Sequence, residues 1–118
     1  MIKIKRVYEP FDAHDGTRFL VERLWPRGMK KDSLRMDGWL KDVAPSDELR
    51  RWFGHDPQRW EEFRRRYAAE LDARPEAWRP LMEAAEQGDV TLLYGAKDTE
   101  HNQAVVLREH LVRAMGRT

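Results

Sequence analysis

The run Val90-Thr-Leu-Leu-Tyr94 constrains the fold of this chain more than any other stretch. It consists of apolar and β-branched residues and lies between Gly88 and Gly95. A short run of this kind, without alternating polar positions, is typical of a strand that is buried on both faces, as in the middle of a parallel sheet. The sequence therefore predicts a sheet in which residues 90–94 form a central strand.

Two further strands are predicted nearer the N-terminus. Residues 1–8 alternate, with Ile2 and Ile4 on one face, which is typical of a strand near the edge of a sheet. Residues 17–24 begin as a second apolar strand, and Pro26 ends it because proline cannot donate a hydrogen bond to a neighbouring strand. The connection between the two strands is about nine residues long, whereas parallel crossovers normally need a dozen or more, so its length alone favours an antiparallel hairpin.

The middle of the chain carries signals for two helices. Ser46 is a natural N-cap, so a short helix is expected to follow it, to run to about residue 53 and to stop at Gly54. Asp56 and Pro57 then begin a second helix as its cap and its first helical residue. The apolar stripe of that helix consists of Trp60, Phe63, Tyr67 and Leu71.

Two more helices are expected in the C-terminal part. Pro75 opens the third helix, and Pro80 should kink or delay it. Asp98 or Thr99 is expected to cap the last helix, which ends at Gly116.

The length and composition are those of one globular domain. Residues 1–118 are expected to form a small single α/β domain, with a three-stranded sheet packed by about four to five helices. A net charge of only +1 gives no general attraction to nucleic acid or to membranes, so neither is expected as a partner. The chain has no cysteine, signal peptide or membrane-length apolar run, which favours a cytoplasmic location and excludes disulfides and thiolate metal sites.

Basic side chains follow the second predicted strand. Arg23 and Arg27, with Lys30 and Lys31, come at or just past its end. Ligands of open α/β sheets bind beyond the carboxyl ends of strands, and the planar guanidinium group binds phosphate or carboxylate in bidentate fashion. Arg23 and Arg27 are therefore candidate substrate-binding residues for a small anionic ligand. The alternative is that both form structural salt bridges with nearby carboxylates, while the lysines are plain surface charge.

Polar side chains also follow the strand at 90–94. Tyr94, Asp98 and His101 are a candidate catalytic acid–base set, because Asp98 lies one helical turn before His101 and could orient its ring and raise its pKa. Asn102 is a candidate substrate-binding residue at the start of the last helix, where free N–H groups favour an anion. The alternative is that Asp98 is only a cap and His101 only a surface residue.

The remaining histidines predict neither a metal site nor a cofactor. His55 precedes Asp56 and could point into the same cavity, and His14 lies between Asp12 and Asp15. Neither cluster has a recognised metal spacing. The chain also lacks a glycine-rich phosphate loop, a nucleophile elbow and a zinc signature.

A binding module without chemistry is the second functional hypothesis. It could dock a regulatory partner or nucleic acid through residues 64–66, which are three consecutive arginines, and through the lysines near residue 30. Carboxylates at Glu61, Glu62 and Glu70 surround these arginines, which indicates a solvated helix face. The near-neutral net charge also argues against strong binding to nucleic acid.

Long segments of the chain resemble one known family, the YeaO-like branch of the domain-of-unknown-function family 488. The segments that carry the resemblance are Lys5–Pro10, Asp15–Lys31, Ala44–Pro57 and Val90–Ala104. The resemblance implies a small prokaryotic cytoplasmic protein with a compact α/β domain, and it implies no function. It also favours a parallel relation between the first two strands, and hence a mainly parallel sheet, against the hairpin that the loop length suggests.

The resemblance further implies a difference in chemistry from the wider family. The resemblance implies that broader relatives carry a Cys-His-Arg motif after the last strand. This chain has Tyr94 to Asp98 at that place, so any chemistry that depends on the cysteine is absent.

Overall fold

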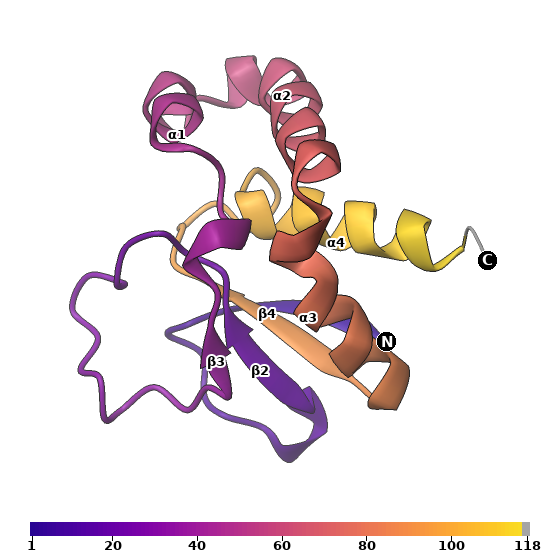
Figure 1. Ribbon diagram of the computed structural model, residues 1–118. Coiled ribbons are helices and arrows are strands. Elements are labelled where there is room, and N and C mark those ends of the chain that lie inside the picture. Colours follow the sequence, from indigo (N-terminus) through magenta and orange to yellow (C-terminus); the bar gives the residue numbers. More distant parts are fainter. Residues whose placement is uncertain (117–118) are drawn as a thin grey trace.

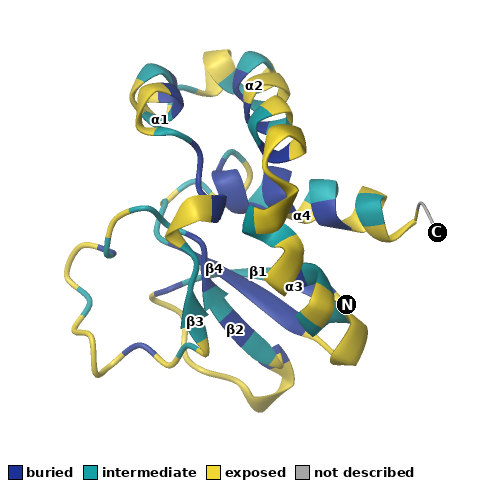
Figure 2. Ribbon diagram, viewed as in Figure 1, coloured by how far each residue is buried: buried dark blue, intermediate teal, exposed yellow. Residues whose placement is uncertain are grey.

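In the part of the chain that the structure describes, the sheet consists of four parallel strands in the order β1-β4-β2-β3 (Figure 1). The computed structural model describes residues 1–116. The strands are β1 (Ile2–Arg6), β2 (Thr17–Leu20), β3 (Gly38–Trp39) and β4 (Val90–Tyr94). Every residue of β4 is buried, which confirms that it is the central strand (Figure 2).

The antiparallel hairpin that the short connection favours is wrong. The strands β1 and β2 do not pair with each other, because β4 lies between them and pairs in parallel with both. Val90 is the partner of Ile2 on one side and of Thr17 on the other. The mainly parallel sheet is confirmed, but it has four strands rather than three. The additional strand, β3, has two residues, which is too short for an alternating pattern to mark it in the sequence.

Within residues 1–116, four α-helices follow or separate the strands, at the lower end of the expected number. They are α1 (Asp47–Phe53), α2 (Trp60–Ala73), α3 (Pro75–Gln87) and α4 (Gln103–Met115). Short 3-10 turns lie at Ala13–Asp15, Lys41–Val43 and Pro57–Arg59. None of the helices within residues 1–116 combines the length and the apolar character needed to cross a membrane.

The ends of α1 are set by local chemistry, as predicted. The Ser46 hydroxyl accepts a hydrogen bond of 3.2 Å from the backbone N–H of Leu49. Gly54 closes the helix in the left-handed region, with φ 52°. Asp56 then accepts a hydrogen bond from the N–H of Gln58 and starts the turn that leads into α2.

Of the two later helices, α3 begins at Pro75 as predicted, and Pro80 lies inside it without delaying its start. The last helix begins later than expected, because Asp98 caps only a turn while the side chain of Asn102 accepts from the N–H of Val105 and caps α4.

The two faces of the sheet are covered in different ways. Val90, Leu92 and Tyr94 belong to the larger core, which the sheet forms with the helices. Leu93 points to the opposite face, where it packs in a smaller core with Leu20. That face is covered mainly by the irregular segment 25–36, which contributes Trp25, Met29, Leu34 and Met36. The protein thus uses irregular chain where a doubly wound fold would use a second layer of helices.

Candidate functional site

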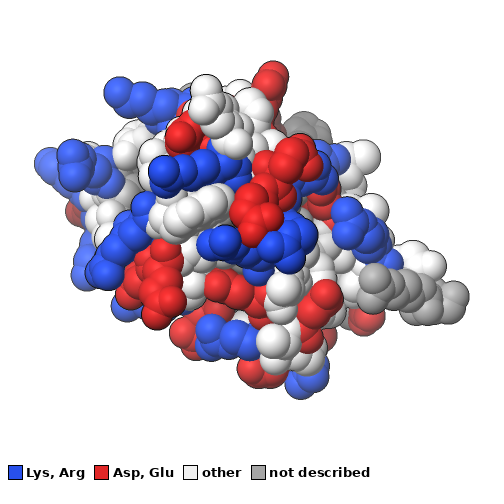
Figure 3. All heavy atoms as spheres, turned by 90° about the horizontal axis from the view of Figure 1, so that it is seen from above, with Lys and Arg blue, Asp and Glu red and all other residues white. Residues whose placement is uncertain are grey.

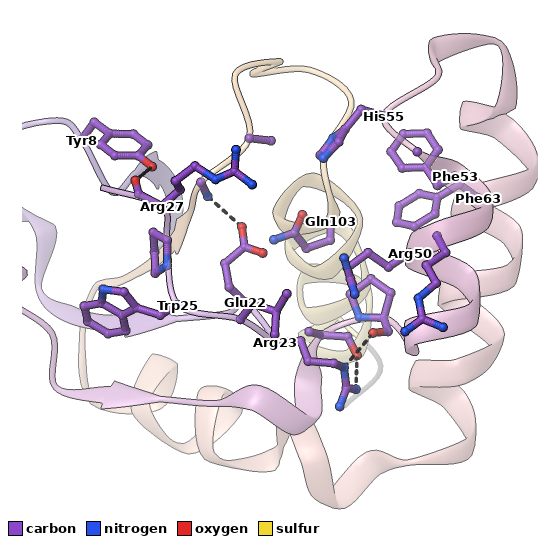
Figure 4. Close-up of a pocket in the computed structure, with 18 residues that line it drawn as sticks. Tyr8, Glu22, Arg23, Trp25, Arg27, Arg50, Phe53, His55, Phe63 and Gln103 are labelled. Carbon is purple, nitrogen blue, oxygen red and sulfur yellow. Dashed lines mark hydrogen bonds between the residues drawn. The ribbon is translucent and has the colours of Figure 1, made fainter. Parts of the chain in front are cut away.

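A cavity of about 400 Å³ lies beyond the carboxyl ends of β2 and β4 (Figure 4). One side is formed by residues 22–27, which follow β2, and by Gly95 and Ala96, which follow β4. The other side is formed by α1 and the residues after it, and by Gln103 at the start of α4. The ionisable side chains of the wall, apart from Tyr8, are Glu22, Arg23, Arg27, Arg50, Arg51 and His55. Five of these six can carry positive charge, so the cavity favours an anion.

Hydrogen bonds from aromatic side chains hold the bend after β2 in place. Tyr8 donates its hydroxyl to the carbonyl of Arg27 at 2.6 Å. The indole of Trp25 donates to the carbonyl of Met29, and the indole of Trp39 donates to the carbonyl of Glu22 at 2.6 Å. The backbone that carries Glu22 and Arg27 is therefore fixed by bonds that leave both side chains available.

Glu22 occupies the middle of the cavity (Figure 4). One carboxylate oxygen accepts a hydrogen bond of 2.7 Å from the backbone N–H of Gly95. This bond joins the segments that follow β2 and β4. No sequence pattern marked Glu22 as a site residue.

The two predicted arginines line the same cavity but differ in what they contact. The guanidinium of Arg23 donates to the carbonyls of Pro45 at 3.3 Å and Ala44 at 3.4 Å, and it lies 3.7 Å from Asp47. The guanidinium of Arg27 is exposed and has no hydrogen bond or ion pair to any of residues 1–116. Arg23 thus ties the cavity wall to the start of α1, while Arg27 is free to meet a ligand.

The opposite wall brings Arg50 and Arg51, which no sequence pattern assigned to binding, and His55, which was expected to point into the cavity. Arg50 lies 3.5 Å from Asp47, and its Nε atom is buried without a partner in the described part of the chain. Arg51 is exposed and has no side-chain partner there. His55 has φ 58°, a left-handed conformation that is uncommon outside glycine. It follows Gly54, which is also left-handed, in the turn after α1.

Aromatic rings supply an apolar part of the wall. Phe53 at the end of α1 and Phe63 in α2 are stacked, with ring centroids 4.2 Å apart and planes at 20°. Leu24 and Pro45 add further apolar surface. The cavity therefore offers charged groups and an apolar surface to one ligand.

The structure places Tyr94, Asp98 and His101 outside this cavity. Tyr94 is buried, and its burial raises the pKa of the phenol. His101 Nδ1 lies 2.9 Å from the Asp98 carboxylate. The same carboxylate accepts from the backbone N–H of Glu100 and of His101, and these bonds with the ring contact hold the pKa of Asp98 below its usual range.

The pair formed by Asp98 and His101 lies behind the aromatic wall. The His101 ring meets Trp60 edge-on, with centroids 5.2 Å apart, and Trp60 stacks on Phe63. This chain of ring contacts connects His101 to Phe63, which lines the cavity. The two halves of the expected site are neighbours and do not share one cavity.

Asn102 is committed to the protein's own backbone. Its amide nitrogen donates to the carbonyl of Asp98, and its amide oxygen accepts from the N–H of Val105. The next residue, Gln103, lines the cavity instead. Because α4 begins later than the sequence predicts, Asn102 is the cap and Gln103, rather than Asn102, reaches the cavity.

Comparisons with known proteins assign the chain to a family. Residues 1–118 match a family described as the inactive DUF488-N3 subclade. The uncharacterised protein YeaO of Escherichia coli is 44% identical over 110 residues, which are 93% of this chain and 96% of YeaO. The chain belongs to the DUF488 family. The resemblance to its YeaO-like branch is thereby confirmed.

Mycobacterial relatives add to this placement in DUF488. Uncharacterised proteins of Mycobacterium tuberculosis and Mycobacterium bovis are each 53% identical over 70 residues, 59% of this chain and 59% of each relative. No solved structure gives a significant match.

The arginine run of this DUF488 chain is neutralised by carboxylates. Arg64 lies 2.6 Å from Glu109, and Arg65 and Arg66 both bond to Glu62. These bonds lower the pKa of Glu62 to about 2. Seen from above, positive and negative side chains are interspersed across the surface (Figure 3).

The remaining histidine cluster of this DUF488 chain is small and exposed. His14 Nδ1 lies 3.0 Å from the carboxylate of Asp12. Within residues 1–116, no three His, Asp or Glu side chains gather as ligands of one metal ion.

Proposed function

We propose that this DUF488 protein binds a small organic anion, bearing a carboxylate or phosphate, in the cavity beyond β2 and β4. The observation that carries this proposal is the pair of arginines, Arg27 and Arg51, on opposite walls of one cavity and without partners in residues 1–116. An arginine without a protein partner can offer its full fork of N–H donors to a ligand. We place this activity in the cytoplasm, which suits a chain without cysteine.

The geometry of the cavity supports an anion over other ligands. Arg50 adds positive charge beside Arg51, and Arg23 adds charge from the side of β2. A partly enclosed space screens charges less than open water does, so several cations around it attract an anion more strongly than the same cations spread over a surface.

Binding without catalysis is the form of the proposal that the comparisons support. The matching subclade is described as inactive. The candidate acid–base pair, Asp98 and His101, does not line the cavity. The cavity would then act as a sensor or carrier site.

Thermal unfolding with added anions tests the proposal. Inorganic phosphate and a panel of organic acids should raise the Tm of the wild type. At a ligand concentration of a hundred times the Kd, binding adds about 2.7 kcal/mol to the free energy of unfolding. Arg27→Ala and Arg51→Ala should each remove most of this shift. Arg79→Ala is the matched control, because Arg79 is an exposed arginine of α3 that does not line the cavity. Equal shifts in all four proteins would contradict the proposal.

An acid–base reaction at Asp98 and His101 is a second candidate, favoured by their 2.9 Å contact. It predicts a turnover that His101→Gln abolishes and Arg27→Ala leaves intact. A screen of hydrolytic substrates against these two variants separates the candidates.

A further inference from the structure

The carboxylate of Glu22 is only half used by the protein. One oxygen accepts from the N–H of Gly95, and no described residue donates to the other. The side chain is partly withdrawn from solvent and points into the cavity (Figure 4). A withdrawn carboxylate without a counter-charge is costly, and this cost falls when a cation or a strong donor meets it.

The positive charges of the cavity do not neutralise Glu22. Four arginines line the same space, yet within residues 1–116 none of them is at ion-pair distance from the Glu22 carboxylate. Arg23 is turned to the carbonyls of Ala44 and Pro45, and Arg50 lies beside Asp47. The cavity therefore keeps one negative and several positive groups apart.

A ligand that carries only negative charge would use the arginines but leave the carboxylate of Glu22 unmatched. It would be attracted by Arg27 and Arg51 and repelled by the carboxylate of Glu22 between the walls. A molecule with both charges would satisfy both sets of groups. The exposed side chain of Leu24, with the nearly buried rings of Phe53 and Phe63 beside the cavity, offers an apolar part of the wall for the rest of such a molecule. The volume of about 400 Å³ falls within the range of small-molecule sites.

We infer that the ligand is a zwitterion: an organic acid that also carries a protonated amine, attached to an apolar body. Its carboxylate or phosphate binds Arg27 and Arg51, its ammonium group binds the free oxygen of Glu22, and its apolar body lies against the apolar part of the wall at Leu24. α-Amino acids with large apolar side chains have this chemistry. This inference rests on the proposed function and goes further by naming the class of ligand.

Calorimetric titration with matched probes tests the inference. Phenylalanine carries both charges, 3-phenylpropionate carries only the acid, and phenethylamine carries only the amine. A panel of the other apolar amino acids, each with its deaminated acid, extends the same comparison. The wild type should bind the zwitterion of the best pair at least about tenfold more tightly than the deaminated acid, since a charge-assisted bond is among the stronger polar contacts.

Single substitutions show which side chains cause the preference for the zwitterion over the deaminated acid. Glu22→Gln keeps an oxygen for the N–H of Gly95 but removes the charge, so it should weaken the zwitterion about tenfold and leave the deaminated acid equal or stronger. Arg27→Ala should weaken both members of the pair. Arg79→Ala should bind as the wild type does.

The outcomes separate the two proposals. If acids bind in an Arg27-dependent way but zwitterions bind no better, the anion site stands and the zwitterion inference is overturned. The inference is also overturned if Glu22→Gln keeps the full preference. If no acid, phosphate or zwitterion binds, both proposals fail.

Discussion

Two clusters of opposite charges lie on this molecule, and the protein uses them in opposite ways. In the first, Asp15 meets Arg18 at 2.5 Å and Lys5 at 3.1 Å, on the sheet face away from the helices. In the second, Glu22 and Arg27 line one cavity without pairing. Both clusters combine arginine with a carboxylate next to β2, and only their contacts tell them apart.

The difference shows how the role of an arginine depends on whether its donors are used. Arg18 is 3% exposed, and its Nε also donates to the carbonyl of Arg35 at 2.8 Å. Buried, and bonded through both Nε and Nη1, it serves the fold. Arg27 is exposed, and residues 1–116 leave its guanidinium unpaired. Arg23 is intermediate between Arg18 and Arg27 in burial and in bonding. Replacing Arg18, Arg23 and Arg27 in turn should therefore cost less and less stability, and the loss of Arg27 should weaken anion binding instead.

Arg18→Ala should have the largest effect on stability. It would leave the buried carboxylate of Asp15 with only Lys5 as its counter-charge. Breaking a buried ion pair from one side costs about 3–5 kcal/mol. Urea unfolding of the variant measures this loss, and a change below about 1 kcal/mol would show that the first cluster is not structural.

Acid should weaken the same cluster in the wild type. Burial by itself raises the pKa of Asp15, but bonds from Lys5 and from the N–H of Asp12, with the charge of Arg18, outweigh it and hold the pKa below the usual 3.8. The unfolded chain then binds the proton more readily, so this contribution to stability is present above pH 3.8 and is lost as the pH falls through the lowered pKa. Unfolding titrations of wild type and Asp15→Asn over this range should show a steeper acid loss in the wild type. Parallel curves would contradict the assignment.

Arg23→Ala should cost less, on the order of 1 kcal/mol. Its bonds to Pro45 and Ala44 are long, and its partner Asp47 is half-exposed, so no buried ion pair is broken. Denaturant titration measures this cost. A loss as large as that of Arg18→Ala would place Arg23 with the structural arginines.

Arg27→Ala and Arg51→Ala should change stability least, by less than about 0.5 kcal/mol, because both side chains are exposed and without partners in residues 1–116. Their effect should fall on anion binding instead. Unfolding curves and anion titrations on the same samples would show this separation. A destabilised variant with unchanged binding would reverse the comparison between the clusters.

Local patterns were enough to predict the parts of the fold that local chemistry decides. The buried run at β4 and the Ser46 and Gly54 ends of α1 depend on neighbours in sequence. The position of β4 between β1 and β2 does not depend on neighbours in sequence, because pairing across the sheet is decided by the packing of distant segments. The length of one loop therefore misled the choice between hairpin and parallel pairing.

The candidate site divides in the same way. Arg23 and Arg27 could be found because they follow a recognisable strand. Arg50 and Arg51 could not, because the position of α1 beside the cavity depends on its packing against α2, which is distant from the strand in sequence. The competition between two possible caps, Asp98 and Asn102, also decides which residue of α4 reaches it.

The central place of β4 also sets the order in which the chain can fold. During synthesis β1 and β2 emerge first, yet β1 has no partner strand until residues 90–94 are made. Contacts between such distant segments form slowly, because a long loop must close before they do. We therefore expect the pairing of β1 and β2 with β4 to wait until residues 90–94 have been translated, so that β1 stays unpaired for most of the synthesis of this domain.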